Sequence, residues 1–124
     1  MDAPVAVLAT VLDPPPPGGP AIDIQHLARM TLGETSLQRE VLALFDRQAD
    51  VLLPRIRRGA PPLAATLAHT LKGSAVGIGA FKVARAAEAV EQAPAGDAAI
   101  AAAIETLAAV LDEAKAEIAR LLAN

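Results

Sequence analysis

Two side chains one helical turn apart, His69 and Lys72, stand out as groups that can carry chemistry. An imidazole acts as a nucleophile at neutral pH because much of a histidine population is uncharged there. On a helix, residues three apart lie on one face, so the Lys72 ammonium can attract and neutralise a phosphoryl group near His69. The pair therefore favours phosphoryl transfer to an imidazole.

The helix face that carries His69 is built mostly from small or apolar residues. A solvent-exposed helix face normally carries Glu, Gln and Lys instead. Gly73, one turn after His69, costs roughly 1 kcal/mol of helix stability relative to alanine. We interpret this face as one that a large partner approaches closely, and we predict four partner-binding residues on it: Ala65, Thr66, Gly73 and Val76.

The composition excludes several other kinds of site. The chain has no cysteine and only two histidines, far apart, which argues against disulfides, thiolate metal sites and a zinc site. No Ser–His–Asp set is present. His26, among polar neighbours, is assigned a surface or cap role. Chemistry at His69 therefore needs a reacting group brought by another molecule, and we expect no cofactor on the chain itself.

Charge and hydropathy limit the partners and the location. The net charge of −3 argues against nucleic-acid binding, which needs a basic surface. No stretch approaches the roughly 18 apolar residues of a membrane span. Asp2 stands where a signal peptide has basic residues. We expect a soluble, cytoplasmic protein that works as a monomer and binds neither nucleic acid nor membrane.

The chain divides into a tail and one domain. The proline and glycine residues of 14–20 exclude a helix interior or a strand ladder there. Residues 1–20 are therefore predicted to be a flexible Pro/Gly-rich tail, and residues 21–124 a helical domain. The apolar residues of the tail either pack on the domain or belong to a loosely attached terminus; they are Val5, Val7, Leu8, Val11 and Leu12.

The body of the chain is rich in alanine and poor in aromatic residues, which suits closely packed helices. A short helix is predicted over 22–32 and a second over 35–58. Thr35 and Gln38 predict a capping box, and Pro54 predicts a kink or an early end near Leu53. One buried stripe is predicted for the second helix: Leu37, Val41, Leu44, Phe45, Leu52 and Ile56.

Three further helices are predicted over 62–76, 80–93 and from residue 97 onward. Gly77 and Gly79 are expected to break the first of them, whose buried side is predicted to include Leu63. The last carries a seam at steps of four and three residues: Ile100, Ile104, Leu107, Leu111, Ala114, Ile118 and Leu121. The fold class is therefore all-α: an antiparallel up-down-up-down four-helix bundle with a short extra N-terminal helix.

The residues HTLKGS at 69–74, followed by Gly-Ala at 79–80, resemble the signature of histidine-containing phosphotransfer (HPt) domains of two-component phosphorelays. The resemblance covers about residues 22–122. It implies a four-helix bundle that works as a phosphorelay intermediate. It also implies a protein without an ATP-binding or kinase domain, and hence not an enzyme in its own right.

The resemblance assigns roles to individual residues. It makes His69 the phosphoacceptor, places Lys72 near the phosphoryl group, and gives Gly73 the task of leaving room for a receiver domain. Glu91 occupies the position of a polar residue on the next helix that orients the imidazole through its other nitrogen.

The implied partners are receiver domains of hybrid histidine kinases and response regulators, with Mg²⁺ held by the receiver. Lys82 and Arg85 either meet an acidic receiver surface or are ordinary helix-surface charges. The alternative function is a helical adaptor that binds a partner through the His69 face without chemistry.

Overall fold

The structure is a computed structural model that describes residues 19–94 and 96–123, without the side chain of Asp97. Residues 1–18, most of the predicted tail, lie outside the described residues. The described part is helical, with α2 (Ile24–Met30), α3 (Thr35–Arg58), α4 (Pro61–Ile78), α5 (Phe81–Glu91) and α6 (Asp97–Ala123).

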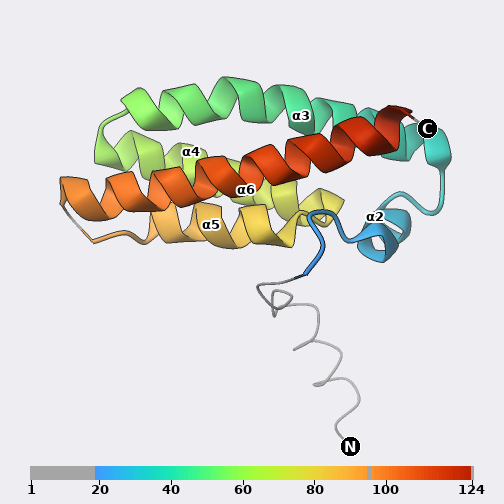
Figure 1. Ribbon diagram of the computed structural model, residues 1–124, viewed down its shortest axis with the longest axis horizontal. Helices are drawn as coiled ribbons and strands as arrows, with labels where there is room; N and C mark the ends of the chain where they lie inside the picture. Colours follow the sequence, from blue (N-terminus) through green and yellow to red (C-terminus); the bar gives the residue numbers. More distant parts are fainter. Residues whose placement is uncertain (1–18, 95, 124) are drawn as a thin grey trace, which may run out of the picture.

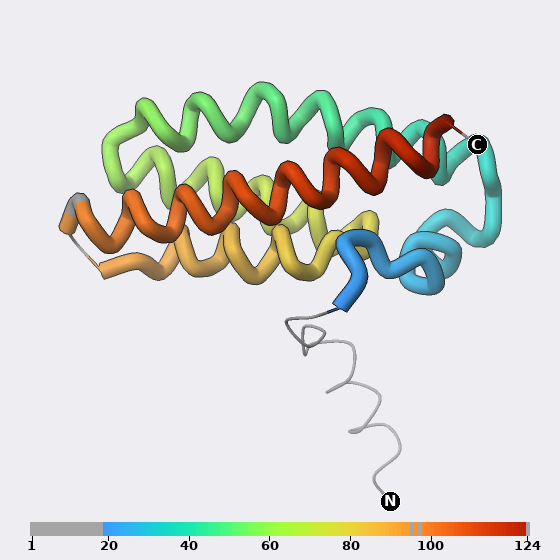
Figure 2. Tube along the Cα trace, in the orientation of Figure 1, coloured from blue at the N-terminus to red at the C-terminus, as the bar shows by residue number. Residues whose placement is uncertain are grey.

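Helices α3 to α6 form an antiparallel four-helix bundle (Figure 1). Consecutive helices run in opposite directions and pack on each other, and α6 packs back against α3. The short helix α2 packs on α4 at the end of the bundle where α3 begins, as the trace in Figure 2 also shows. The predicted fold class is confirmed.

Aliphatic residues and alanine supply the core. The predicted α6 seam is confirmed: Ile104, Leu107, Leu111, Ala114 and Ile118 are buried, and Ile100 and Leu121 are partly buried. Between α4 and α5 the buried residues include Ala68, Ala75, Ala84 and Ala87. Because alanine is short, these two helices can pack at close distance. The small residues therefore set the distance between α4, which carries His69, and α5, which carries Glu91.

Helix α3 has the predicted bounds, but two predicted details within it are wrong. Glu34 is the N-cap and makes no side-chain hydrogen bond there, so the expected capping box is wrong. Pro54 lies inside the helix, which continues to Arg58, so the early end is also wrong. Ile56, in the turn after the proline, is fully buried, and its packing holds the last turn in place.

Helix α3 also carries two apolar stripes instead of one. The inner stripe is buried in the core: Leu42, Phe45, Ala49, Leu52 and Ile56. On the outer side, Leu37, Leu44 and Val51 are 39%, 59% and 58% exposed. The predicted burial of Leu37 and Leu44 is wrong because the two stripes overlap in sequence, both repeating at steps of three and four residues.

Helix α4 runs through Gly77 and ends at Gly79, so only the second of the two predicted breakers ends it. Gly79 has φ +82°, a left-handed conformation that side chains disfavour. Its carbonyl accepts a hydrogen bond of 2.9 Å from the Asp23 amide. A Cβ at Gly79 would lie 2.7 Å from the Asp23 carbonyl oxygen. Glycine is required here by both conformation and contact.

We expect Gly79→Ala to lower the free energy of unfolding by about 2 kcal/mol or more, since it combines left-handed strain with a clash. Gly77→Ala is the matched control, because a Cβ there meets nothing within 4 Å. In a helix interior that change is stabilising by up to about 1 kcal/mol. Urea denaturation of both variants measures the difference, and equal losses would contradict this account.

His26 fastens α2 to the rest of the domain. Its backbone amide donates to Asp23 Oδ1 at 3.0 Å, and its Nε2 donates to the Val76 carbonyl at 2.8 Å. Its ring also packs edge-on against Phe81, with centroids 4.9 Å apart. The second histidine therefore has a structural role, holding α2 against the end of α4 and the start of α5.

Candidate functional site

His69 lies on the outer surface of α4. The side chain is 64% exposed, while its neighbours Ala68 and Leu71 are fully buried and anchor the helix. Leu63, predicted on the buried side of this helix, is instead 45% exposed. The exposed imidazole agrees with the interpretation of this face as one that a partner can approach.

Glu91, the last residue of α5, contacts the imidazole. Its Oε2 lies 2.8 Å from His69 Nδ1. A carboxylate oxygen can only accept, so Nδ1 carries the proton and Nε2 keeps the lone pair. Val90, buried directly before Glu91, fixes this last turn of α5 against the core. The contact therefore sets both the orientation and the tautomer of His69.

Lys72 contacts the other oxygen of the same carboxylate. Its Nζ lies 3.2 Å from Glu91 Oε1, and both side chains are about three-quarters shielded from solvent. Oε1 is buried and makes no hydrogen bond of regular geometry, so the ammonium supplies its charge compensation. The three side chains named as chemically important thus form one cluster, with Glu91 shared between His69 and Lys72.

The pKa of the Glu91 carboxyl is subject to opposing effects. Partial burial raises the pKa, whereas hydrogen bonds and charge from Lys72 and His69 lower it. The result is a pKa below its ordinary value of 4.5. The carboxyl group is therefore ionised at neutral pH and available as an acceptor for the imidazole.

Gly73 has open space around it. A Cβ built at this position meets nothing within 4 Å, so packing inside the bundle does not require glycine here. On the same face, Val76 is 41% exposed, Thr66 is exposed and Ala65 is half-buried. The Thr66 hydroxyl donates to the Pro62 carbonyl of its own helix. The structure thus brings the predicted partner-binding residues of α4 onto one low, accessible surface.

Lys82 and Arg85 lie on α5. Lys82 Nζ is 3.2 Å from Glu113 Oε1 on α6, and its side chain is only 20% exposed. Arg85 is half-buried. Of the predicted docking residues, Lys82 is thus engaged with a neighbouring helix of the bundle.

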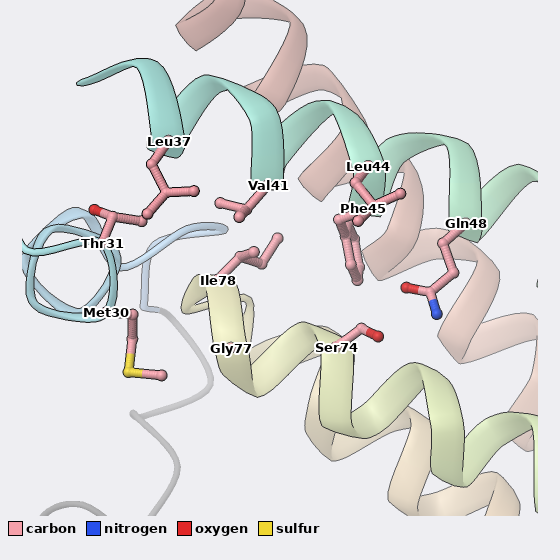
Figure 3. Close-up of a pocket in the computed structure, with 10 residues that line it drawn as sticks. All are labelled: Met30, Thr31, Leu37, Val41, Leu44, Phe45, Gln48, Ser74, Gly77 and Ile78. Atoms are coloured by element: carbon pink, nitrogen blue, oxygen red, sulfur yellow. The ribbon is translucent and has the colours of Figure 1, made fainter. Parts of the chain in front are cut away.

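An apolar groove between α3 and α4 is a feature that the sequence prediction missed. Figure 3 shows α3 side chains facing the last two turns of α4 across it. The groove has a volume of about 300 Å³, and a second cavity of about 450 Å³ also borders Leu44, Gln48 and Ser74. The signal was present in sequence as the second stripe of α3, but it was assigned to the core.

The described part of the chain lacks two other kinds of site. No group of three or more His, Cys, Asp or Glu side chains is placed to hold a metal ion. None of the described helices combines the length and hydropathy needed to cross a membrane.

The structure combines a four-helix bundle with an exposed histidine that is hydrogen-bonded to a carboxylate, and this combination indicates a class of protein. The Hpt domain family matches residues 35–124, which span α3 to α6 and hold the whole cluster. The chain therefore belongs to the Hpt domain family.

Among solved structures, the chain is similar to the histidine phosphotransferase ShpA from Caulobacter crescentus. The two share 31% sequence identity, and the alignment covers 81% of this chain and 88% of that chain with a TM-score of 0.64. No match was found among curated protein sequences.

Proposed function

We propose that this chain is a phosphorelay intermediate. It accepts a phosphoryl group from the aspartate of one receiver domain onto His69 and passes it to the aspartate of another. The observation that carries the proposal is the 2.8 Å contact between His69 Nδ1 and Glu91, which leaves Nε2 as the nucleophilic nitrogen of an exposed imidazole. Membership of the Hpt family supports phosphotransfer as the chemistry.

The proposed step is an in-line displacement at phosphorus. Nε2 forms the new N–P bond, the P–O bond to the receiver aspartate breaks, and the aspartate leaves as a carboxylate. The ring becomes cationic, and the Nδ1–H···Oε2 hydrogen bond to Glu91 stabilises that charge. Mg²⁺, expected on the receiver and not on this chain, neutralises charge on the transferring group.

Lys72 gains a second anionic partner when His69 is phosphorylated. Lys72 lies one helical turn after His69 on the same helix, and in the structure its ammonium pairs with Glu91. Its flexible stem lets the ammonium move between the carboxylate and the phosphoryl oxygens. We propose that this movement offsets the charge added at His69.

On this proposal the partners are receiver domains of hybrid histidine kinases and response regulators, which a monomer meets one at a time in the cytoplasm. The docking face centres on four residues of α4: Ala65, Thr66, Gly73 and Val76. Lys82 and Arg85 of α5 lie on its flank. Such contacts are transient and belong at the small end of the range of protein interfaces.

The relay itself can be tested in two steps. A receiver domain carrying ³²P on its aspartate is mixed with the chain, and the labelled chain is then purified and mixed with a second receiver. We expect label on the chain that survives base and is lost in acid, followed by its transfer to the second receiver. A chain that binds receivers but never acquires label would support the adaptor function instead.

Gly73 offers a test of the docking face. We expect Gly73→Leu to slow transfer roughly tenfold or more, because a branched side chain keeps the receiver from closing on His69. It should not lower stability, since the space around Gly73 is open and leucine favours helix. Ala102→Leu, at an exposed position on α6, is the control. Equal transfer rates for the two variants would contradict a docking role for Gly73.

A further inference from the structure

The Glu91 carboxylate is shared by two side chains of α4. Its Oε2 lies 2.8 Å from His69 Nδ1, and its Oε1 lies 3.2 Å from Lys72 Nζ. The Glu91 side chain is 27% exposed and Oε1 is buried, so the solvent screens this charge only weakly. A change of charge at His69 or Lys72 therefore acts directly on the carboxylate.

The proton on Nδ1 decides how readily a phosphorylated imidazole gives up its phosphoryl group. When Nε2 carries phosphorus, breaking the N–P bond returns an electron pair to Nε2. A ring that keeps its Nδ1 proton leaves as neutral imidazole, whereas a ring without that proton leaves as an imidazolide anion. Because the anion is a far stronger base and a poorer leaving group, the group that holds the Nδ1 proton determines the rate of this step.

We propose that Glu91 holds the Nδ1 proton in place while His69 is phosphorylated, and so makes phosphorylated His69 an efficient phosphoryl donor. The phosphorylated ring with its Nδ1 proton is a cation, and a carboxylate at hydrogen-bond distance favours that form. A neutral acceptor in the same place would orient the ring without this charge effect. The use of the proton in onward transfer rests on the proposed function, whereas the hold on the proton does not.

Lys72 connects this hold to the presence of the phosphoryl group. Burial raises the pKa of the Glu91 carboxyl, but hydrogen bonds and charge from Lys72 and His69 bring it below its ordinary value. When the Lys72 ammonium turns to the phosphoryl oxygens, the buried Oε1 loses this partner. The carboxylate then relies on the ring cation for charge compensation, and the Nδ1–H···Oε2 hydrogen bond strengthens.

The other charged groups near His69 act on the ring less directly. On α4, His69 and Lys72 are the only titratable side chains. On α5, Glu88 lies one turn before Glu91 and accepts from Gln92, and Arg85 lies one turn earlier still. The remaining packed helices engage their charged or titratable groups elsewhere: Asp46, Asp50 and Arg57 of α3 with α6, Glu113 of α6 with Lys82, and His26 of α2 with the Val76 carbonyl.

With the Nδ1 proton held, the onward step needs no separate proton donor. An aspartate oxygen of the acceptor receiver forms the new O–P bond, the Nε2–P bond breaks, and its electron pair stays on Nε2. The ring loses its positive charge but keeps Nδ1–H. His69 thus returns to the tautomer that its contact with Glu91 sets, ready to accept again.

The proton can be followed on the isolated chain, without a receiver. Phosphoramidate, a small-molecule donor, transfers its phosphoryl group to Nε2 and releases ammonia. In ¹⁵N-labelled chain, the chemical shifts of the ring nitrogens report whether Nδ1 is protonated. As the pH is raised, phosphorylated His69 should keep this proton to a pH about one unit higher in the wild-type chain than in Glu91→Gln. His69→Gln, treated in the same way, identifies any signal from His26.

Glu88→Gln is the matched control for this titration. It removes the same charge from a carboxylate on the same face of α5, one that contacts Gln92. It should shift the titration much less than Glu91→Gln does. Equal titrations for the wild-type chain and Glu91→Gln, or equal shifts for the two variants, would overturn the proposal. A chain that phosphoramidate does not label at His69 would contradict the free Nε2 on which it depends.

A rate measurement tests the leaving group separately. Water also takes the phosphoryl group: its oxygen bonds to phosphorus, the Nε2–P bond breaks, and the water supplies both protons of the dihydrogen phosphate that leaves. At about pH 9, Glu91→Gln should lose phosphate about tenfold more slowly than the wild-type chain, as a shift of one pH unit implies. The two rates should converge near pH 5, where Nδ1 is protonated in both chains and Glu91, with its pKa below 4.5, is still ionised.

A ratio of rates that is the same at both pH values would indicate a merely structural effect and refute the leaving-group role. Neither measurement uses a receiver. A chain that passes no phosphoryl group to a receiver would therefore overturn the proposed function while the hold of Glu91 on the proton could still be demonstrated.

Discussion

His69→Gln is expected to abolish labelling by a phosphorylated receiver. Glutamine keeps a polar side chain of similar length but has no nucleophilic nitrogen, so no N–P bond can form. The bundle should be unaffected, because the His69 side chain is 64% exposed and its anchoring neighbours remain. The measurement is ³²P retained on the chain after electrophoresis under alkaline conditions, with helix content from circular dichroism as the check on folding.

The second histidine provides the matched control for this experiment. His26→Gln changes a residue that fastens α2 through Val76, and it should reduce stability while leaving labelling in place. Equal label on His69→Gln and the wild-type chain would show that another residue accepts the phosphoryl group, and the proposed mechanism would then be wrong.

Glu91→Ala has the second-largest expected effect. It removes the acceptor for Nδ1, so the imidazole loses its fixed orientation and tautomer, and it leaves Lys72 without its ion-pair partner. We expect transfer to slow by roughly 10- to 100-fold, the range seen when a carboxylate that orients a metal-bound histidine is removed. Single-turnover transfer from a labelled receiver measures the rate. An unchanged rate would remove Glu91 from the mechanism.

A pH series tests whether the ionised Glu91 carboxylate stabilises the folded chain. The pKa of Glu91 is lower in the folded chain than its ordinary value of 4.5, so the ionised carboxylate adds stability above that pH. This contribution is lost as the pH falls through the lowered pKa. The stability difference between wild type and Glu91→Gln, from urea denaturation, should therefore be constant near neutrality and shrink below about pH 4.5. A stability difference between the two chains that is the same at pH 3 and pH 7 would contradict a stabilising role of the ionised Glu91 carboxylate.

Local spacing was enough to predict the part of the candidate site that lies on α4. Lys72 and Gly73 lie about one helical turn after His69, so the relation of the three follows from helix geometry alone. Glu91 is 22 residues from His69 and on another helix, and only the family resemblance pointed to it. The pairing of Lys72 with Glu91 was not foreseen, because it depends on how closely α4 and α5 pack.

The fold was predictable where one stripe stood alone. In α6 the apolar seam has no competing pattern, and its burial is as predicted. In α3 the inner and outer stripes interleave, with Leu44 next to Phe45, and periodicity cannot tell which one faces the core. Helix α3 continues past Pro54 because Ile56 packs into the core. This is a tertiary contact, and the helix propensities of the local residues do not predict it.

The position of Glu91 as the final residue of α5 has a consequence for the control of the site. Helix ends open more readily than helix centres, so the contact of Glu91 with His69 depends on the packing of Val90, which holds this turn against the core. Each opening releases His69 from its acceptor and frees Lys72. The fraction of time that this turn is closed thus sets how much of the time the imidazole of His69 is held in one orientation.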